Sequence, residues 1–156
     1  MPRPAYILFA ESGSLDEFTN QVSAFNIVEL IIVRKSIPDL PPFPSRQIKR
    51  KFRLIAAWIK DDGDTPDVVF QIQLSCFDQA GRAIYTSGID SFSFTPDSYF
   101  HRYIASTVEF NGFPSLGEYS VEARLRRVGE QEWMVRQSFP FLVMEIPPIE
   151  EDSVAN

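Results

Sequence analysis

Apolar and polar residues alternate strictly over several stretches of this chain, most clearly over residues 68–77, VVFQIQLSCF. Four apolar residues of that stretch fall on one side of an extended chain: Phe70, Ile72, Leu74 and Cys76. Because successive side chains of a β-strand point to opposite faces, the pattern predicts a strand with one buried face and one wet face. Residues 119–128, YSVEARLRRV, repeat the pattern and predict a second such strand.

The same alternation along the chain predicts about nine strands. We expect them at 5–10, 22–33, 51–59, 68–77, 82–87, 90–94, 103–110, 119–128 and 132–145. The segment 22–33 is apolar on both faces, which is typical of a central strand or of two strands joined by a kink. Ser14 and Glu17 have the spacing of a helix capping box, so we expect at most one short helical turn there. Short strands separated by turns predict an all-β, immunoglobulin-like antiparallel β-sandwich.

The chain length and the aromatic content agree with this fold class. The 156 residues predict one domain, and fourteen phenylalanines favour the core of a β-sandwich over that of a helical bundle. We expect the sandwich domain over residues 1–146 and a disordered acidic tail over 147–156. Four prolines within 36–45 predict an extended surface crossover. The two sheets are expected to meet over Phe70, Leu74, Phe92, Phe94, Val108, Tyr119, Val121 and Phe141.

A tyrosine with a polar tip begins the apolar row of the strand at 119–128. In Greek-key sandwiches a tyrosine at this place often turns its hydroxyl back to the backbone a few residues upstream, in a tyrosine corner. The sequence SLGEYSV supplies Gly117 for a tight turn, followed by Tyr119. We therefore predict a structural tyrosine corner at Gly117 and Tyr119; the alternative is an ordinary half-buried strand tyrosine.

One N-terminal pattern resembles a known family. Residues 16–29 carry Asp16, Thr19, Asn20, Ser23, Phe25, Asn26 and Glu29 in the order D-x-x-T-N-x-x-S-x-F-N-x-x-E. This is similar to the signature of an uncharacterised bacterial family of small, single-domain, immunoglobulin-like proteins that end in Gly-x-Tyr followed by Pro-Phe-x-Val. The resemblance implies the sandwich fold and a bacterial origin, and it implies no catalytic residues. Asn26 and Glu29 need polar partners if they are buried; otherwise they mark the wet face of a kinked strand.

Two groups of charged residues are candidate binding sites. Asp61, Asp62, Asp64 and Asp67 cluster around Gly63, and oxygen ligands of this kind suit Ca²⁺. The loop lacks the final glutamate of an EF-hand, so an acidic surface hairpin is the favoured interpretation. Residues 46–53 contain five basic residues that could bind an anion, nucleic acid or an acidic partner: Arg46, Lys49, Arg50, Lys51 and Arg53. A positive strand end that balances nearby acids is the favoured alternative, and the net charge of −6 makes nucleic acid an unlikely partner.

The residue set argues against an enzyme. Cys76 is the only cysteine and His101 the only histidine. The alternation places Cys76 in the core, where a thiol is inert, and His101 is expected in a surface loop just before a strand. A single cysteine excludes an internal disulfide, and the first residues lack the apolar length of a signal peptide or a membrane span, so we expect a cytoplasmic protein.

The leading hypothesis is therefore a non-catalytic protein-interaction or assembly module without a cofactor, acting on an unknown protein partner. We expect it to bind through loops 34–48 and 60–67. The alternatives are a carboxylate-based enzyme in a cleft between end loops, and anion or nucleic-acid binding through 46–53. The strand at 51–59 also has apolar residues on its second face, at Ile55, Ala57 and Ile59. Residues 26–33, NIVELIIV, are likewise apolar on both sides. Such a face needs a cover, which the proline loop, the tail or a second copy could supply, and our hypothesis is a homodimer through that sheet.

Overall fold

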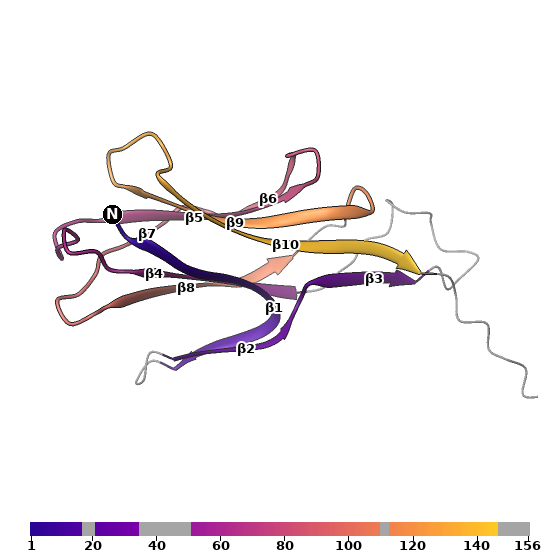
Figure 1. Ribbon diagram of the computed structural model, residues 1–156, viewed down its shortest axis with the longest axis horizontal. Coiled ribbons are helices and arrows are strands. Elements are labelled where there is room, and N and C mark those ends of the chain that lie inside the picture. The colour runs from indigo at the N-terminus through magenta and orange to yellow at the C-terminus, as the bar shows by residue number, and fades with distance from the viewer. Residues whose placement is uncertain (17–20, 35–50, 110–112, 147–156) are drawn as a thin grey trace, which may run out of the picture.

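The fold consists of two β-sheets that pack face to face (Figure 1). It is described here from a computed structural model, which covers residues 1–16, 21–34, 51–109 and 113–146. The first sheet has four strands in the order β2-β1-β4-β8, namely β2 (Gln21–Ile27), β1 (Arg3–Asp16), β4 (Lys51–Ile59) and β8 (Phe100–Glu109). The second has six, with β3 (Leu30–Arg34), β10 (Val135–Ile146), β9 (Gly117–Arg127), β5 (Phe70–Asp78) and β6 (Ala83–Thr86) in that order, and β7 (Asp90–Phe92) also pairing with β5.

The predicted all-β sandwich class is confirmed, with two differences. The described residues form ten strands, and β3 runs parallel to β10, so the second sheet is mixed and the expectation of two purely antiparallel sheets was wrong. The described part of the chain also contains no helix, and hence none that could span a membrane. Ser14 belongs to β1, opposite Ser23, and residues 17–20 of the expected helical turn lie outside the description.

Both differences arise at a kink in the segment 22–33. Asn26 has a positive φ of 54°, a conformation that asparagine tolerates better than most residues. The next residues leave the first sheet: the Val28 amide donates to the Phe9 carbonyl at 2.7 Å, and the chain then enters the second sheet as β3. The segment is therefore two strands on the edges of different sheets, which is the kinked alternative of the sequence analysis. Asn26 and Glu29 are exposed at this kink.

The core lies between the sheets and is rich in aromatic rings. The Phe9 ring, in the first sheet, lies 4.8 Å from the Phe141 ring of the second. Six of the eight predicted core residues are buried: Phe70, Leu74, Phe94, Tyr119, Val121 and Phe141. Phe92 is half-buried against the same cluster. Val108 lies in β8 opposite Phe52, but its side chain is outside the described set.

One polar side chain links the sheets through this core. The register between β1 and β4 shifts between Pro4 and Tyr6, opposite Ala57. The carbonyl of Ala57 accepts a hydrogen bond of 2.8 Å from Nε2 of Gln137, a buried residue of β10. The bond gives a partner to a buried carbonyl beside an irregularity of the strand ladder. A buried carbonyl without a hydrogen bond would lower the stability of the fold.

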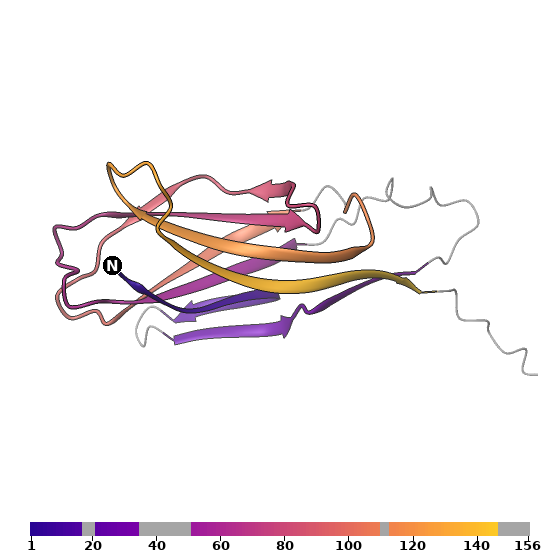
Figure 2. The same ribbon diagram turned by 45° about the horizontal axis from the view of Figure 1, so that its top comes forward.

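The outer face of β4 is covered by the chain itself. Ile55 and Ala57 are both fully buried, although they point away from the core row of Leu54, Ala56 and Trp58. After Ala10, where its pairing with β4 ends, β1 turns away, and the β1–β2 hairpin returns beneath β4 and β8 (Figures 1 and 2). A methyl group placed on Gly13 in this hairpin would lie only 2.9 Å from Cδ1 of Ile55. The buried residues on this face therefore need no second copy to cover them.

Candidate functional site

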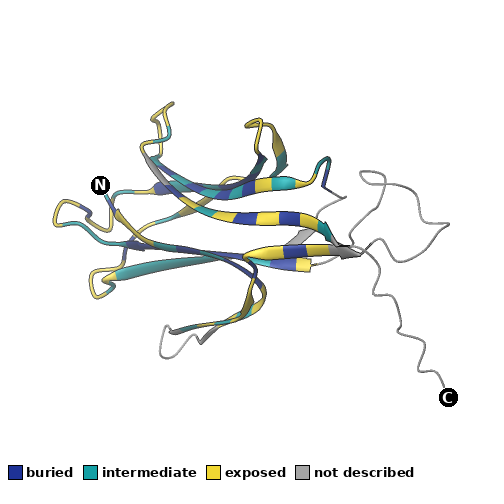
Figure 3. Cartoon of the chain, turned by 45° about the vertical axis from the view of Figure 1, so that its right-hand side comes forward, coloured by how far each residue is buried: buried dark blue, intermediate teal, exposed yellow. Residues whose placement is uncertain are grey.

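Four apolar side chains are exposed together where β3 and β10 lie side by side. Leu30 is opposite Leu142 and Ile32 is opposite Met144 in the parallel register. Their exposed fractions are 44% for Leu30 and Ile32, 37% for Leu142 and 38% for Met144. Figure 3 shows the alternation of buried and exposed residues along β10 that puts this row on the outside. We call these four residues the apolar edge patch.

The patch follows from a change of pattern along β10. Outward positions early in the strand carry Ser138 and Pro140, whereas the later ones carry Leu142 and Met144. The inward positions Phe141 and Val143 are buried in the core. Because both rows of the later half are apolar, one of them has to face away from the core. The sequence analysis noted that residues 26–33, which include Leu30 and Ile32, are apolar on both sides, but it did not notice the doubly apolar run 139–144 that supplies Leu142 and Met144.

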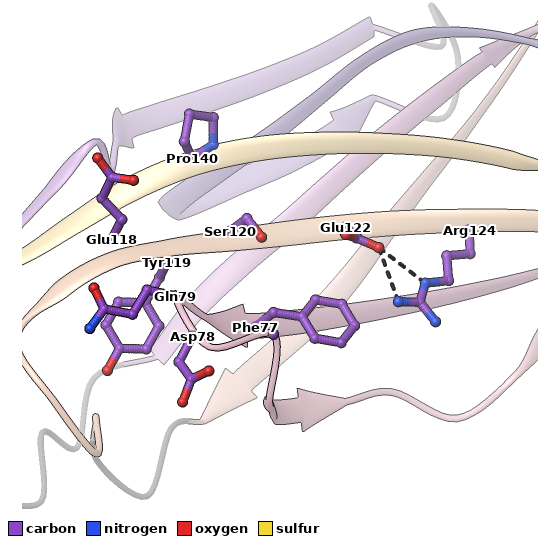
Figure 4. A pocket seen from close by; sticks show the side chains of 10 residues that line it. Phe77, Asp78, Gln79, Glu118, Tyr119, Ser120, Glu122, Arg124 and Pro140 are labelled. Carbon is purple, nitrogen blue, oxygen red and sulfur yellow. Dashed lines mark hydrogen bonds and ion pairs between the residues drawn. The ribbon is translucent and has the colours of Figure 1, made fainter.

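A groove adjoins the patch on the same face of the sheet. It has a volume of about 430 Å³ and is lined by β5, β9, β10 and the turn after β5 (Figure 4). Pro140 of β10 lies opposite Ser120 of β9, which in turn lies opposite Phe77 of β5. The next row connects the groove to the patch, because Glu118 lies opposite Leu142. Patch and groove therefore form one continuous surface. The volume of the groove lies within the range of small-molecule binding sites.

Ion pairs and one ring contact fix the walls of the groove. Glu122 accepts hydrogen bonds of 3.1 and 3.0 Å from Nε and Nη2 of Arg124, drawn as dashed lines in Figure 4. The Arg124 guanidinium also lies 4.8 Å from the centre of the Phe77 ring, within cation–π distance. Glu118 is exposed at the junction with the patch, so it offers a carboxylate to whatever binds there.

Asp78 is committed to the turn at the end of β5. Its Oδ2 accepts hydrogen bonds of 2.9 and 2.7 Å from the Arg82 side chain, and its Oδ1 accepts from the backbone amides of Ala80 and Arg82. The bonds from the Arg82 amide and side chain hold the pKa of this carboxyl below its usual value. Gly81 has a positive φ of 76°, as the turn requires. A carboxyl held ionised in this way does not suit the general acid of a carboxylate enzyme.

The other half of this outer face is polar and internally paired. Arg126 donates from Nε to Gln71 at 2.9 Å and from Nη1 to the Gln131 carbonyl at 3.1 Å. Its guanidinium also lies 4.5 Å from the centre of the Trp133 ring. Gln73 donates to the Ser87 carbonyl at 3.3 Å. These groups satisfy one another, which leaves the apolar half as the part of the face that would gain from a partner.

The basic run is only partly described. Arg46, Lys49 and Arg50 lie outside the described residues. Lys51 is exposed at the start of β4, opposite Glu109, and Arg53 is half-buried on the same strand. Anion binding through this run therefore stays a prediction, as does binding through loop 34–48.

The aspartate loop is held by a hydrogen bond within the loop and by contacts with Met1. The amide of Asp61 donates to Oδ2 of the buried Asp64 at 2.9 Å. The Met1 ammonium lies 3.4 Å from Oδ1 of Asp64 and 3.5 Å from Oδ2 of Asp61. Asp62 and Asp67 are exposed. Within the described residues no three His, Cys, Asp or Glu side chains come close enough together to hold a metal ion, and cation binding by this loop stays a prediction.

Cys76 and His101 do not form a catalytic pair. Cys76 is fully buried in the core cluster, and burial, with a smaller effect of the Asp78 charge, raises the pKa of its thiol far above the usual value. His101 lies within β8, so its expected position in a surface loop was wrong. Its ring stacks on Phe92 with the centres 3.5 Å apart and the planes 3° from parallel. Burial lowers the pKa of His101 to about 4.

The Tyr119 side chain points inward at the end of the groove. Its hydroxyl donates to the Ser115 carbonyl at 2.7 Å and accepts from the Ser115 amide at 3.2 Å. The ring is buried, packing against Phe113 and Phe141. Gly117, between the two bonded residues, has a positive φ of 125°. This geometry, a tyrosine at the start of β9 bonded to the backbone four residues upstream, has the form of a tyrosine corner.

No model of a known protein family matches the chain, and no curated protein matches it in sequence. The resemblance of residues 16–29 to an uncharacterised bacterial family therefore stays a prediction, and the functional argument rests on the geometry alone.

Proposed function

We propose that this protein is an immunoglobulin-like, non-catalytic protein-interaction module that binds through the apolar edge patch and the adjoining groove. The patch carries the proposal: four apolar side chains, each more than a third exposed, are matched across two neighbouring strands. Exposed apolar side chains gathered in this way, with polar residues around them, are typical of protein-binding surfaces. The immunoglobulin-like assignment is supported by the Tyr119 geometry at the start of β9, the next-to-last strand.

The chemistry of the surface also favours binding over catalysis. The carboxylates of Asp78 and Glu122 are both paired with arginine side chains. Catalytic carboxylates, in contrast, need partners or environments that separate their pKa values. A protein partner would bury the patch and meet the Glu118 carboxylate with a donor or a positive charge.

A photocrosslinking side chain placed at two positions of the same outer face tests this proposal. One variant carries the photoreactive residue at Leu142, in the patch, and the matched control carries it at Gln73, in the polar half. We expect irradiation in the native cells to give a protein adduct from position 142 and none from position 73. Equal adducts from both positions, or no adduct from position 142, would contradict the proposal.

A further inference from the structure

Within the described chain, one charged side chain of the proposed binding surface has no partner of opposite charge. The groove is lined by four charged residues: Asp78, Glu118, Glu122 and Arg124. Oδ2 of Asp78 lies 2.7 Å from Nη2 of Arg82, and Oε2 of Glu122 lies 3.0 Å from Nη2 of Arg124. Glu118 is exposed, and none of the described cations pairs with it. The surface therefore carries one carboxylate whose charge is not compensated.

The register of β9 and β10 places Glu118 between the groove and the apolar edge patch. Glu118 lies opposite Leu142, which belongs to the patch. Two residues further along β9, Ser120 lies opposite Pro140, and both line the groove. Side chains directly opposite each other on one face of an antiparallel pair are about 5 Å apart at Cβ. A partner that contacts Leu142 therefore also comes close to the Glu118 carboxylate.

A partner that covers Leu142 removes water from Glu118 as well. An ionised carboxylate that loses its hydration and gains no counter-ion destabilises a complex by more than the burial of one apolar side chain stabilises it. A purely apolar partner would therefore bind this surface weakly. A cation opposite Glu118 replaces the lost hydration with charge-assisted hydrogen bonds.

We propose that the partner is a cationic amphipathic segment of another protein, in which one arginine is flanked by apolar residues. The apolar residues cover the apolar edge patch, and the arginine binds Glu118. This inference rests on the proposed function, since it names the chemistry of the partner of the same surface. Arginine fits better than lysine, because its planar guanidinium binds a carboxylate through two hydrogen bonds and is less strongly hydrated. Its apolar stem can lie along Leu142 and Pro140.

The charge of the whole chain favours such a partner over a second copy. The net charge of −6 attracts a cationic segment and repels an acidic one. A second copy that used the same surface would bring the same set of charges. In that set the two arginines, Arg82 and Arg124, are already paired within their own chain, and Glu118 would meet no arginine from the groove of the other copy.

Selection from a random peptide library displayed on phage tests the inference. The baits are the full-length wild type, Glu118→Lys, and the matched control Glu132→Lys. Glu132 is exposed in the turn between β9 and β10, at the far end of β9, so its replacement changes the net charge equally without touching the surface. Wild type and control should select peptides with an arginine between apolar residues, and Glu118→Lys should select an acidic residue in its place.

The affinity of one selected peptide gives the size of the effect. We expect Glu118→Lys to weaken its binding by about tenfold or more, and Glu132→Lys to leave it nearly unchanged. Leu142→Ser should weaken it as well, which locates the peptide on the patch. Because Glu118 and Leu142 are both exposed, these variants should keep the wild-type melting temperature.

Three outcomes would overturn the inference. Peptides that depend on Leu142 but bind wild type and Glu118→Lys equally would overturn the cationic partner and leave the proposed function standing. A wild type that forms dimers, with Leu142→Ser monomeric, would identify a second copy as the occupant instead. A library that yields no peptide dependent on Leu142 would contradict both the inference and the proposed function.

Discussion

At the scale of single residues, Tyr119 shows how one side chain can pack in the core and also hydrogen-bond buried backbone groups at its edge. Its hydroxyl satisfies both the amide and the carbonyl of Ser115, while its ring extends the aromatic cluster of Phe113 and Phe141. Replacing it with phenylalanine keeps the ring and leaves both backbone groups without this partner. The loss of stability in this variant therefore measures the hydrogen bonds of the corner rather than the packing of the ring.

We expect Tyr119→Phe to lower the free energy of unfolding by about 1 kcal/mol or more, the typical net value of a buried hydrogen bond. Urea unfolding followed by fluorescence measures it. The matched control is Tyr99→Phe at an exposed ring, which should be neutral. Equal effects of the two substitutions would show that the Ser115 bonds do not stabilise the corner.

His101 should be neutral down to unusually low pH. Its ring is stacked on Phe92, and burial lowers its pKa to about 4. Because the unfolded chain binds this proton near pH 6.5 and the folded chain only near pH 4, stability should fall as pH falls between these values. Allowing for its partial exposure, we expect a loss of about 1–3 kcal/mol.

A proton NMR titration of this single histidine gives its pKa directly. His101→Phe keeps a ring against Phe92 and should remove this part of the pH dependence, which makes it the matched control. A titration midpoint near 6.5 would mean that the ring is solvated and that the stack on Phe92 does not form in solution.

The thiol of Cys76 should be unreactive in the folded protein. It is fully buried among apolar side chains, and burial raises its pKa, so little thiolate is present at neutral pH. We expect a chromogenic disulfide reagent to detect no thiol in the native chain and one thiol per chain in urea. Rapid labelling of the native protein would place Cys76 outside the core.

At the scale of elements, the β1–β2 hairpin serves as a cover for the four-stranded sheet. Gly13 permits its close approach, because an added methyl group would lie 2.9 Å from Cδ1 of Ile55 and 3.1 Å from the Ser23 carbonyl. Ile55 is fully buried as a result. The hairpin thus buries the second apolar face of β4.

Gly13→Ala should therefore destabilise the protein, by about 1 kcal/mol, even though alanine reduces the entropy of the unfolded chain. Gly63→Ala is the matched control, since nothing lies within 4 Å of the methyl group it adds. Thermal unfolding of the two variants decides the point. A Gly13→Ala protein as stable as the Gly63→Ala protein would mean that the hairpin does not pack on β4.

The elements also show what the sequence could and could not predict. Strands β5 and β9 follow from alternation because each has one dry and one wet face, and their core residues were predicted correctly. Alternation fails where both faces are apolar, as in 22–33 and 139–144. In these segments the two-residue alternation does not predict which row of side chains faces inward or which sheet the strand joins. That choice depends on contacts with distant residues such as Phe9.

The proposed binding surface was found only in part for the same reason. Sequence reasoning considered charged clusters such as Asp61–Asp67 and 46–53 and apolar second faces at 26–33 and 51–59, but it did not consider the apolar run 139–144. Leu30 and Met144 come from segments more than one hundred residues apart, and only the parallel pairing of β3 with β10 brings them together.

At the scale of the whole molecule, the outer faces of the two sheets are covered in different ways. The four-stranded sheet covers β4 with its own hairpin, and the polar half of the six-stranded sheet is paired through the contacts of Arg126 with Gln71, Gln131 and Trp133. On the outer face of the six-stranded sheet the apolar edge patch gathers four exposed apolar side chains, and we propose that another chain binds there. That asymmetry is the central claim of this account.

Residue-resolved amide hydrogen exchange along β3 tests that claim most directly. The amides of Ile31 and Val33 should be protected from exchange, because they face β10 in the parallel ladder. Those of Leu30 and Ile32 should exchange rapidly, because they point away from β10 and no strand of the described chain pairs with that side of β3. Protection of Ile32 equal to that of Ile31, or rapid exchange of Ile31, would contradict the claim that β3 is an edge strand paired in parallel with β10.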